Sequence, residues 1–242
     1  MEGPGATLHA TPGSWPAPWT VTVVPETGST NTDLVAAAAA GAPHGSVLVA
    51  DHQTAGRGRL DRGWSAPPGT NLLVSILFRD VAGPLHRSTQ RVAVAAARAC
   101  ESVAGVRPAL KWPNDLLLDG RKLAGVLAQA GAVDGRVAFV VVGIGLNIGW
   151  APQGAARLPR GTRDDVLRAL LTALTALPQD IGEEYRHRLG TIGENVRVEL
   201  PDGVLSGVAE DVDDDGRLVL ATTEGRRVVD VGDVIHMRRS AP

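Results

Sequence analysis

The strongest constraint on the fold is an unbroken apolar run from Val137 to Ile144, which follows a turn near Asp134-Gly135. A run of this length is typical of a strand in the centre of a sheet, buried on both faces. Residues 86–103 and 166–174 carry apolar side chains at helical spacing, and shorter strand-like segments accompany them. This alternation predicts a sheet with helices packed on it.

The dipeptide Asp119-Gly120 is the strongest short hairpin signal in the chain. If this turn pairs Leu118 with Arg121, the alternation of side chains puts Asp115 and Lys122 on the same face of the sheet. The hairpin therefore predicts a carboxylate and an amine on a shared surface.

The charge of the chain is divided unevenly. Residues 1–193 carry 18 basic and 15 acidic groups, whereas residues 194–242 carry 6 and 11. From Asn195 onward, short alternating segments with Gly or Asp turns predict a small all-β barrel. Residues 1–18 are rich in Gly, Pro and Ala and are expected to be flexible. We therefore expect a main domain over 19–193 and a small β domain over 194–242.

Composition argues against several classes of protein. The net charge of −2 gives no general attraction to nucleic acid or to an anionic membrane. The only cysteine, Cys100, cannot form a disulfide within the chain and is expected to be a core residue. No leader is recognisable, and no run approaches the ~20 apolar residues of a membrane span, so we expect a cytoplasmic protein. The six histidines lack ligand spacing, so no metal site made by the protein alone is expected.

Lysine occurs only twice, against 22 arginines, and both lysines lie between residues 111 and 122. Where arginine serves as the general surface cation, a retained lysine can be needed as a compact, titratable charge. Chance placement is the alternative. The clustering therefore indicates a site only if the neighbouring residues support it.

A second distinctive run extends from Gly56 to Trp64 and alternates arginine with glycine. Backbone N–H groups and guanidinium groups in such a loop can wrap an anion. From composition alone, a solvated turn is an equal alternative. An RNA-binding Arg-Gly segment is disfavoured, because such segments are longer, repeated and set in a basic chain. There is no Walker pattern, so a nucleotide would bind without a P-loop.

Taken in order, five motifs resemble those of the biotin protein ligases. They are Ser29-Thr30-Asn31, Gly56-Arg57-Gly58-Arg59 with Trp64, Lys111-Trp112-Pro113-Asn114-Asp115, Arg121-Lys122-Leu123-Ala124-Gly125 and Gly143-Ile144-Gly145-Leu146-Asn147. The resemblance runs from Thr27 to about the C-terminus. It implies an α+β fold, in which a mixed β-sheet with packed helices, similar to class II aminoacyl-tRNA synthetases, is joined to a Src-homology-3-like barrel. Regulatory families add a helix-turn-helix, for which residues 1–18 are too short, so we expect no operator binding.

The resemblance also implies two sets of ligand contacts. The biotin-binding set is Ser29, Thr30, Asn31, Gln53, Arg57, Gly58, Arg59, Lys122, Gly125, Gly143 and Gly145. The ATP- and adenylate-binding set is Arg57, Arg59, Trp64, Lys111, Asn114, Lys122 and Asn147. Residues 29–31 and Gln53 would hydrogen-bond the ureido ring of biotin, whose buried amides need matched partners. The alternatives are helix capping for residues 29–31 and turn formation for the glycines.

Three residues are expected to be catalytic. Lys111 would stabilise charge on the phosphate, and Arg59 would belong to a loop that keeps water off a reactive mixed anhydride. Asp115 would accept or orient the proton of the acceptor lysine. Lys122 would hold the carboxylate of biotin, and Mg would accompany ATP, held largely by the phosphates.

The implied reaction passes through biotinyl-5′-adenylate to a lysine of the biotin carboxyl carrier protein or domain of an acyl-CoA or pyruvate carboxylase. No nucleic-acid or membrane partner is implied, and a weak homodimer is compatible with the resemblance. Two alternatives stay open: a lipoate or octanoate ligase, and a non-catalytic biotin or nucleotide sensor. One residue departs from the family loop, because Asp61 stands where glycine is expected. If that position needs a positive φ, the loop would close more slowly or differently.

Overall fold

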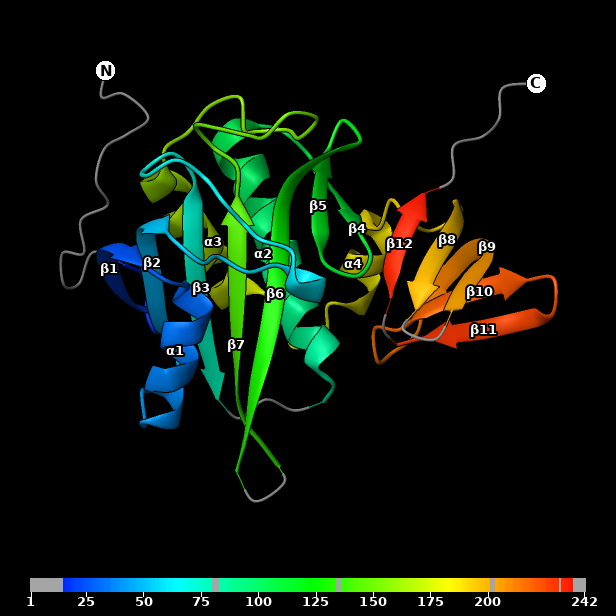
Figure 1. Ribbon diagram of the computed structural model, residues 1–242, viewed down its shortest axis with the longest axis horizontal. Coiled ribbons are helices and arrows are strands. Elements are labelled where there is room, and N and C mark those ends of the chain that lie inside the picture. Colours follow the sequence, from blue (N-terminus) through cyan, green and yellow to red (C-terminus); the bar gives the residue numbers. More distant parts are fainter. Residues whose placement is uncertain (1–14, 80–82, 134–135, 201–202, 231, 237–242) are drawn as a thin grey trace.

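The computed structural model describes residues 15–79, 83–133, 136–200, 203–230 and 232–236, which form a large sheet with helices and a small sheet beside it (Figure 1). The large sheet has seven strands in the order β1-β2-β3-β7-β6-β5-β4. They are β1 (Thr20–Thr27), β2 (Ser46–Gln53), β3 (Leu72–Arg79), β4 (Ala109–Lys111), β5 (Asp115–Leu118), β6 (Arg121–Val133) and β7 (Arg136–Leu146). β1 and β2 pair in parallel and the other neighbours are antiparallel, so the sheet is mixed.

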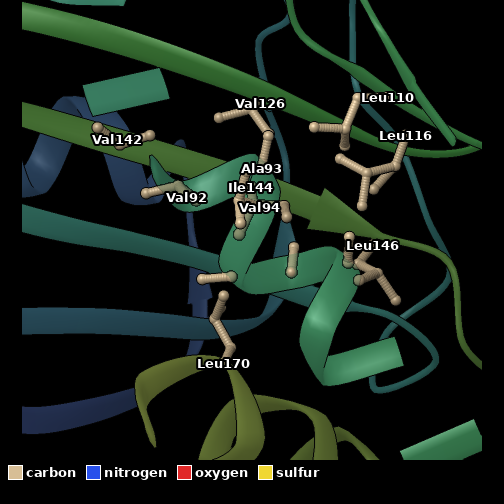
Figure 2. Packing of buried hydrophobic residues seen from close by; sticks show 14 of the residues in the cluster. Val92, Ala93, Val94, Leu110, Leu116, Val126, Val142, Ile144, Leu146 and Leu170 are labelled. Carbon is tan, nitrogen blue, oxygen red and sulfur yellow. The ribbon is translucent and has the colours of Figure 1, made fainter. Parts of the chain in front are cut away.

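β7 is the central strand, as its apolar run predicts. The helices around the sheet are α1 (Thr30–Ala39), α2 (Leu85–Ala104), α3 (Arg163–Ala176) and α4 (Gly182–Arg188). Val140 and Val142 belong to the core formed with α2 and α3. Figure 2 shows Val142 in this core together with Val92 of α2 and Leu170 of α3. Val141 belongs to a second core on the other face, with Leu34 of α1. Helices therefore cover both faces of β7.

α2 is buried on nearly all sides because it lies between the sheet and α3. Its centre, Val92 to Ala97, consists of small residues that are each at most 4% exposed. Small side chains allow the sheet and α3 to pack closely against the helix. Cys100 is fully buried here, and this burial raises the pKa of its thiol to about 12. Cys100 is therefore a core residue, as predicted.

The N-termini of α3 and α1 differ in how they are capped. Thr162 caps α3: its hydroxyl accepts a hydrogen bond from Asp165 N, and the Asp165 carboxylate accepts one from Thr162 N, both at 3.1 Å. Ser29 occupies the N-cap position of α1, but its side chain makes no capping hydrogen bond. Capping therefore does not account for this serine.

The small sheet is antiparallel, with the strand order β11-β10-β9-β8-β12. Its strands are β8 (Asn195–Leu200), β9 (Gly203–Val212), β10 (Leu218–Thr222), β11 (Gly225–Val229) and β12 (Asp233–His236). β12 is too short for the alternation pattern to reveal it. The α+β class with a small C-terminal all-β unit is confirmed, whereas the exact division between 193 and 194 stays a prediction.

Trp112 joins the small unit to the large one. Its indole Nε1 donates to the carbonyl of Gly216 at 2.9 Å, and its backbone N–H donates to Thr191 Oγ1 at 3.1 Å. The side chain is 1% exposed, so this contact lies inside the joined core. The docking also brings residues 232–233 to the Arg-Gly loop of the large unit.

Part of the expected N-terminal lead-in is packed. The Arg168 guanidinium of α3 lies 4.7 Å from the centroid of the Trp15 ring, within cation–π range. Residues 1–14 and the turn expected at Asp134-Gly135 lie outside the described residues, although Val133 pairs with Arg136 across that turn. Among the helices described, none is long and apolar enough to cross a membrane.

We expect Cys100 in the native protein to react with an aromatic disulfide reagent at pH 8 at least roughly 100-fold more slowly than in the unfolded chain. Burial both blocks approach and suppresses the thiolate. The absorbance of the released thiol measures the rate, and the urea-unfolded protein is the control. Rapid labelling of the native protein would contradict the assignment to the core.

Candidate functional site

A cavity of about 280 Å³ opens on the face of the large sheet that also carries α1, near the lower size limit of small-molecule sites. Its walls come from the start of α1, the end of β2, the Arg-Gly loop, β6, β7 and β12. The predicted site residues that line it are Ser29, Thr30, Asn31, Gln53, Arg57, Gly58, Arg59, Trp64, Asn114, Asp115, Lys122, Gly125, Gly143, Gly145 and Asn147. Lys111 is the predicted site residue that is not in the lining.

The cavity forms where the sheet lacks side chains. Gly143 and Gly145 share one face of β7, and Gly145 is paired with Gly125 of β6. A Cβ at Gly143 would overlap the Asn31 side chain, and one at Gly145 would overlap the Trp64 ring. Because these glycines lie within strands, they provide room for side chains to approach the sheet, and turn formation does not explain them.

A chain of hydrogen-bonding side chains forms the floor of the cavity. Gln53 Oε1 accepts from the backbone N–H and the hydroxyl of Thr30 at 2.8 and 2.9 Å. Ser75 Oγ lies 2.8 Å from Thr30 Oγ1 and 2.6 Å from Asn31 Oδ1. Asn31 Nδ2 donates to the carbonyl of Leu127 at 3.1 Å. Ser75, which the sequence analysis missed, is fully buried and holds two predicted site residues in place.

The predicted hairpin places a carboxylate and an amine on one wall. Leu118 pairs with Arg121 as expected, although a bulge interrupts the ladder of β5. Lys122 Nζ lies 2.7 Å from Asp115 Oδ1. The contact is an ion pair, because its geometry is not that of a hydrogen bond to this buried oxygen. Lys122 Nζ also lies 5.7 Å from the Trp64 ring centroid, within cation–π range.

Lys111 lies close to this wall without reaching the cavity lining. It ends β4 and is paired with Asp115 of β5, so the two side chains belong to the same face of the sheet. The shared face is consistent with a location beside the cavity. Its catalytic role stays a prediction.

The Arg-Gly loop is closed at its base by a hydrogen bond from the Trp64 N–H to the Gly56 carbonyl at 2.9 Å. The backbone of Leu60 has a φ of 53°, and its side chain is 66% exposed. Leu60 is therefore a left-handed residue of the loop. The expectation for the backbone at Asp61 stays a prediction.

The small sheet anchors this loop. Arg59 Nη2 donates to the carbonyl of Gly232 at 3.0 Å, and Arg62 pairs with Asp233 at 2.5 Å. Burial lowers the pKa of Arg59, while the Asp233 and Asp115 carboxylates oppose that shift. No local pattern in the sequence points to Asp233, because 171 residues separate it from Arg62.

Two asparagines are engaged by the surrounding backbone. Asn114 Nδ2 donates to the carbonyl of Val126 at 2.8 Å. Asn147 Oδ1 accepts from Asn71 Nδ2 at 3.1 Å, and its Nδ2 donates to the carbonyl of Ala156 at 2.9 Å. Because Asn147 is 2% exposed and both ends of its amide are engaged, it braces the cavity. Asn71 is a further residue that the sequence analysis missed.

The charged lining of the cavity is mainly positive. It consists of Arg57, Arg59, Arg62, Lys122, Asp115 and Asp233. An excess of cations favours an anionic ligand. Within the described residues, no group of three or more His, Cys, Asp or Glu side chains is arranged to hold a metal ion.

Two segments of the chain match protein families that are both named for biotin protein ligases. Residues 23–147 match the Biotin/lipoate A/B protein ligase family, and residues 191–237 match the Biotin protein ligase C terminal domain. A biotin–[acetyl-CoA-carboxylase] ligase of Mycobacterium tuberculosis is 42% identical, with 89% of this chain and 88% of the relative covered. The bifunctional ligase/repressor BirA of Bacillus subtilis is 32% identical, with 80% of this chain and 66% of the relative covered.

A solved structure supports the fold independently. The biotin protein ligase from Aquifex aeolicus in complex with biotin and ATP matches with a TM-score of 0.76 at 24% identity, covering 90% of this chain and 98% of that one. At this level of identity, the likeness concerns the fold alone.

We expect Gly143→Ala to lower the free energy of unfolding by about 1–3 kcal/mol, because the added methyl overlaps Asn31 in a packed strand. Urea denaturation measures the change. Gly28→Ala is the matched control, since nothing lies within 4 Å of a Cβ there. Equal stability changes in the two variants would contradict the close approach of Asn31 to the strand.

Proposed function

The chain belongs to the biotin protein ligases of the Biotin/lipoate A/B protein ligase family, and we propose that the cavity described above is its active site. The enzyme joins biotin and ATP to give biotinyl-5′-adenylate and pyrophosphate, and it then transfers the biotinyl group to a lysine of a carboxylase's biotin carrier. One observation carries the assignment of the site. A polar floor, the Lys122–Asp115 pair and the Arg-Gly loop meet in a single cavity.

The ureido ring of biotin is proposed to lie on the polar floor. The ring has two N–H donors and a carbonyl acceptor, all of which need partners when water is excluded. Thr30, Asn31 and Gln53 offer oxygen atoms there. Ser29 is 4% exposed and makes no capping bond, so its hydroxyl can serve the same ligand. The glycine patch leaves space for the ring against the sheet.

In the first half-reaction, Lys122 orients the biotin carboxylate toward the α-phosphorus of ATP. The carboxylate oxygen forms a bond to phosphorus, the bond between the α-phosphorus and its bridging oxygen breaks, and pyrophosphate leaves. Arg57 and Arg59 offset the negative charge of the phosphates, and Lys111 is proposed to act on the same charge from beside the wall. Mg²⁺ is expected to be held largely by the phosphates, which suits its preference for oxygen ligands and retained water.

In the second half-reaction, Asp115 is proposed to receive or orient a proton of the carrier lysine. A free lysine with a pKa of ~10.4 is neutral in only about one molecule in 2,500 at pH 7, so a carboxylate that accepts or orients the departing proton has a clear role. The amine attacks the carbonyl carbon of the mixed anhydride, an amide forms and AMP leaves. The loop anchored at Gly232 would keep competing water away.

The carrier belongs to a biotin-dependent carboxylase, and two relatives are named for acetyl-CoA carboxylase. We propose the carrier domains of acyl-CoA and pyruvate carboxylases as acceptors. A cytoplasmic location fits the free, buried thiol of Cys100.

A lipoate or octanoate ligase is the competing activity, because the matched family includes lipoate ligases. The fatty-acyl chain of those substrates has no N–H donors. Such a chain offers no hydrogen-bond donor to the oxygen atoms of Thr30, Asn31 and Gln53, whereas the ureido ring of biotin offers two. The floor therefore favours biotin.

The direct test is incubation of the protein with ATP, Mg²⁺ and a purified carrier domain, in parallel with biotin, lipoate or octanoate. Intact-mass spectrometry is expected to show a gain of biotin minus one water on the carrier, and none in a carrier whose acceptor lysine is changed to arginine. A mass gain with lipoate or octanoate alone would reject the biotin assignment. Biotin binding without pyrophosphate exchange would indicate a sensor.

We expect Lys111→Arg to fold and bind biotin normally while losing about 10²–10³-fold in the rate of adenylation, because a compact charge near the phosphate is replaced by a bulkier one. Biotin-dependent pyrophosphate exchange measures this rate. Lys122→Arg is the comparison, in which biotin binding is expected to weaken instead. Wild-type exchange in Lys111→Arg would remove Lys111 from the mechanism.

We expect Arg59→Ala to release biotinyl-adenylate about tenfold faster, since the variant loses both a cationic contact and the hydrogen bond to Gly232. Release is measured from a preformed complex with labelled biotin, chased with unlabelled ligand. Arg136→Ala, an exposed arginine at the start of β7, is the control. An unchanged release rate would mean that Arg59 does not retain the intermediate.

A further inference from the structure

A carboxylate of the small unit reaches the rim of the cavity. Asp233 begins β12, lines the cavity and pairs with Arg62, and its side chain is 24% exposed. The carbonyl of the preceding residue, Gly232, accepts from Arg59. Two consecutive residues therefore hold two arginines of the Arg-Gly loop.

The position of Asp233 in the small sheet is electrostatically unfavourable. Its cross-strand partner in β8 is Glu199, so two carboxylates are placed opposite each other. Like charges in directly opposed positions destabilise a sheet. The position of Asp233 is better explained by its contact with Arg62, which lies in the loop of the other unit.

The carboxylate uses the same hydrogen-bond donors that a phosphate would use. Guanidinium groups bind carboxylate and phosphate oxygens through the same N–H groups, and both acceptors are anionic. A phosphate that binds the Arg62 guanidinium weakens its contact with Asp233, because the two anions compete for one cation. Asp233 would also repel a phosphate that enters the cavity beside it.

We propose that Asp233 is a positioning residue: Asp233 and the phosphates of ATP bind the loop arginines in turn. The proposal rests on the cavity being the site of biotin adenylation. The triphosphate draws Arg62 away from Asp233 as ATP binds. After pyrophosphate leaves, the adenylate carries less negative charge, and Asp233 regains Arg62. The loop is then held over the intermediate by the protein's own anion.

The exchange predicts two effects of opposite sign in Asp233→Asn, which keeps the shape of the side chain and removes its charge. ATP should bind about two- to fivefold more tightly, because a competing and repelling anion is gone. Biotinyl-adenylate should be lost about two- to fivefold faster, because the loop loses its anchor. A variant that merely damaged the fold would weaken the binding of both ligands.

Calorimetric titration with ATP and a chase of labelled biotinyl-adenylate measure the two effects in the full-length protein. Both differences from wild type should shrink at about 1 M salt, where exposed charges are screened over about 3 Å. Asp230→Asn is the matched control, since it removes a nearby carboxylate that pairs with His86 instead. Arg62→Ala should lose the adenylate faster without any gain in ATP affinity.

Weaker ATP binding in Asp233→Asn, or an unchanged loss of adenylate, would overturn the proposal. Failure of the wild-type protein to form any adenylate from biotin would instead overturn the assigned function. In that case, two measurements still test the exchange. They are the ATP titration and the rate at which trypsin cleaves the loop with and without ATP. A loop that is no more susceptible in Asp233→Asn than in wild type would count against it.

Discussion

The burial of β7 on both faces governs the arrangement of the whole large unit. Its even-numbered residues, from Val140 to Leu146, are apolar throughout and pack toward α2. Its odd-numbered residues are apolar only as far as Val141, which packs on α1, and are then replaced by Gly143 and Gly145. From Val140 to Leu146 the strand therefore supplies core on one face, whereas its other face is bare at Gly143 and Gly145. The cavity lies where the second core stops.

Local patterns in the sequence were sufficient for the parts of the site that belong to one hairpin or one strand. The Asp119-Gly120 turn predicts that Lys122 and Asp115 lie on one face of the sheet, and in the structure the two side chains are in contact despite a register shift in between. The unbroken run of β7 likewise predicted its central place. In both cases, the period of two in a strand converts sequence spacing into a spatial relation.

Contacts between distant segments could not be predicted in this way. Ser75 reads as one polar residue in an apolar strand, and only the fold places it beside Asn31, 44 residues away. Leu60 takes a left-handed backbone although leucine gives no signal for one. The motif from Lys111 to Asp115 supplies Asn114 and Asp115 to the cavity lining, but its spacing could not show that Lys111 lies outside that lining.

The anchoring of the Arg-Gly loop by Gly232 has a consequence for the order in which the molecule matures. Ribosomal synthesis proceeds from the N-terminus, and domains generally begin to fold as they emerge. All seven strands of the large sheet precede β12 in the chain, so they can assemble while β12 is still being made. A nascent chain could thus possess the binding floor before it can secure the loop. Competence to retain a reactive intermediate would be acquired only after β12 has been synthesised and has docked on the loop.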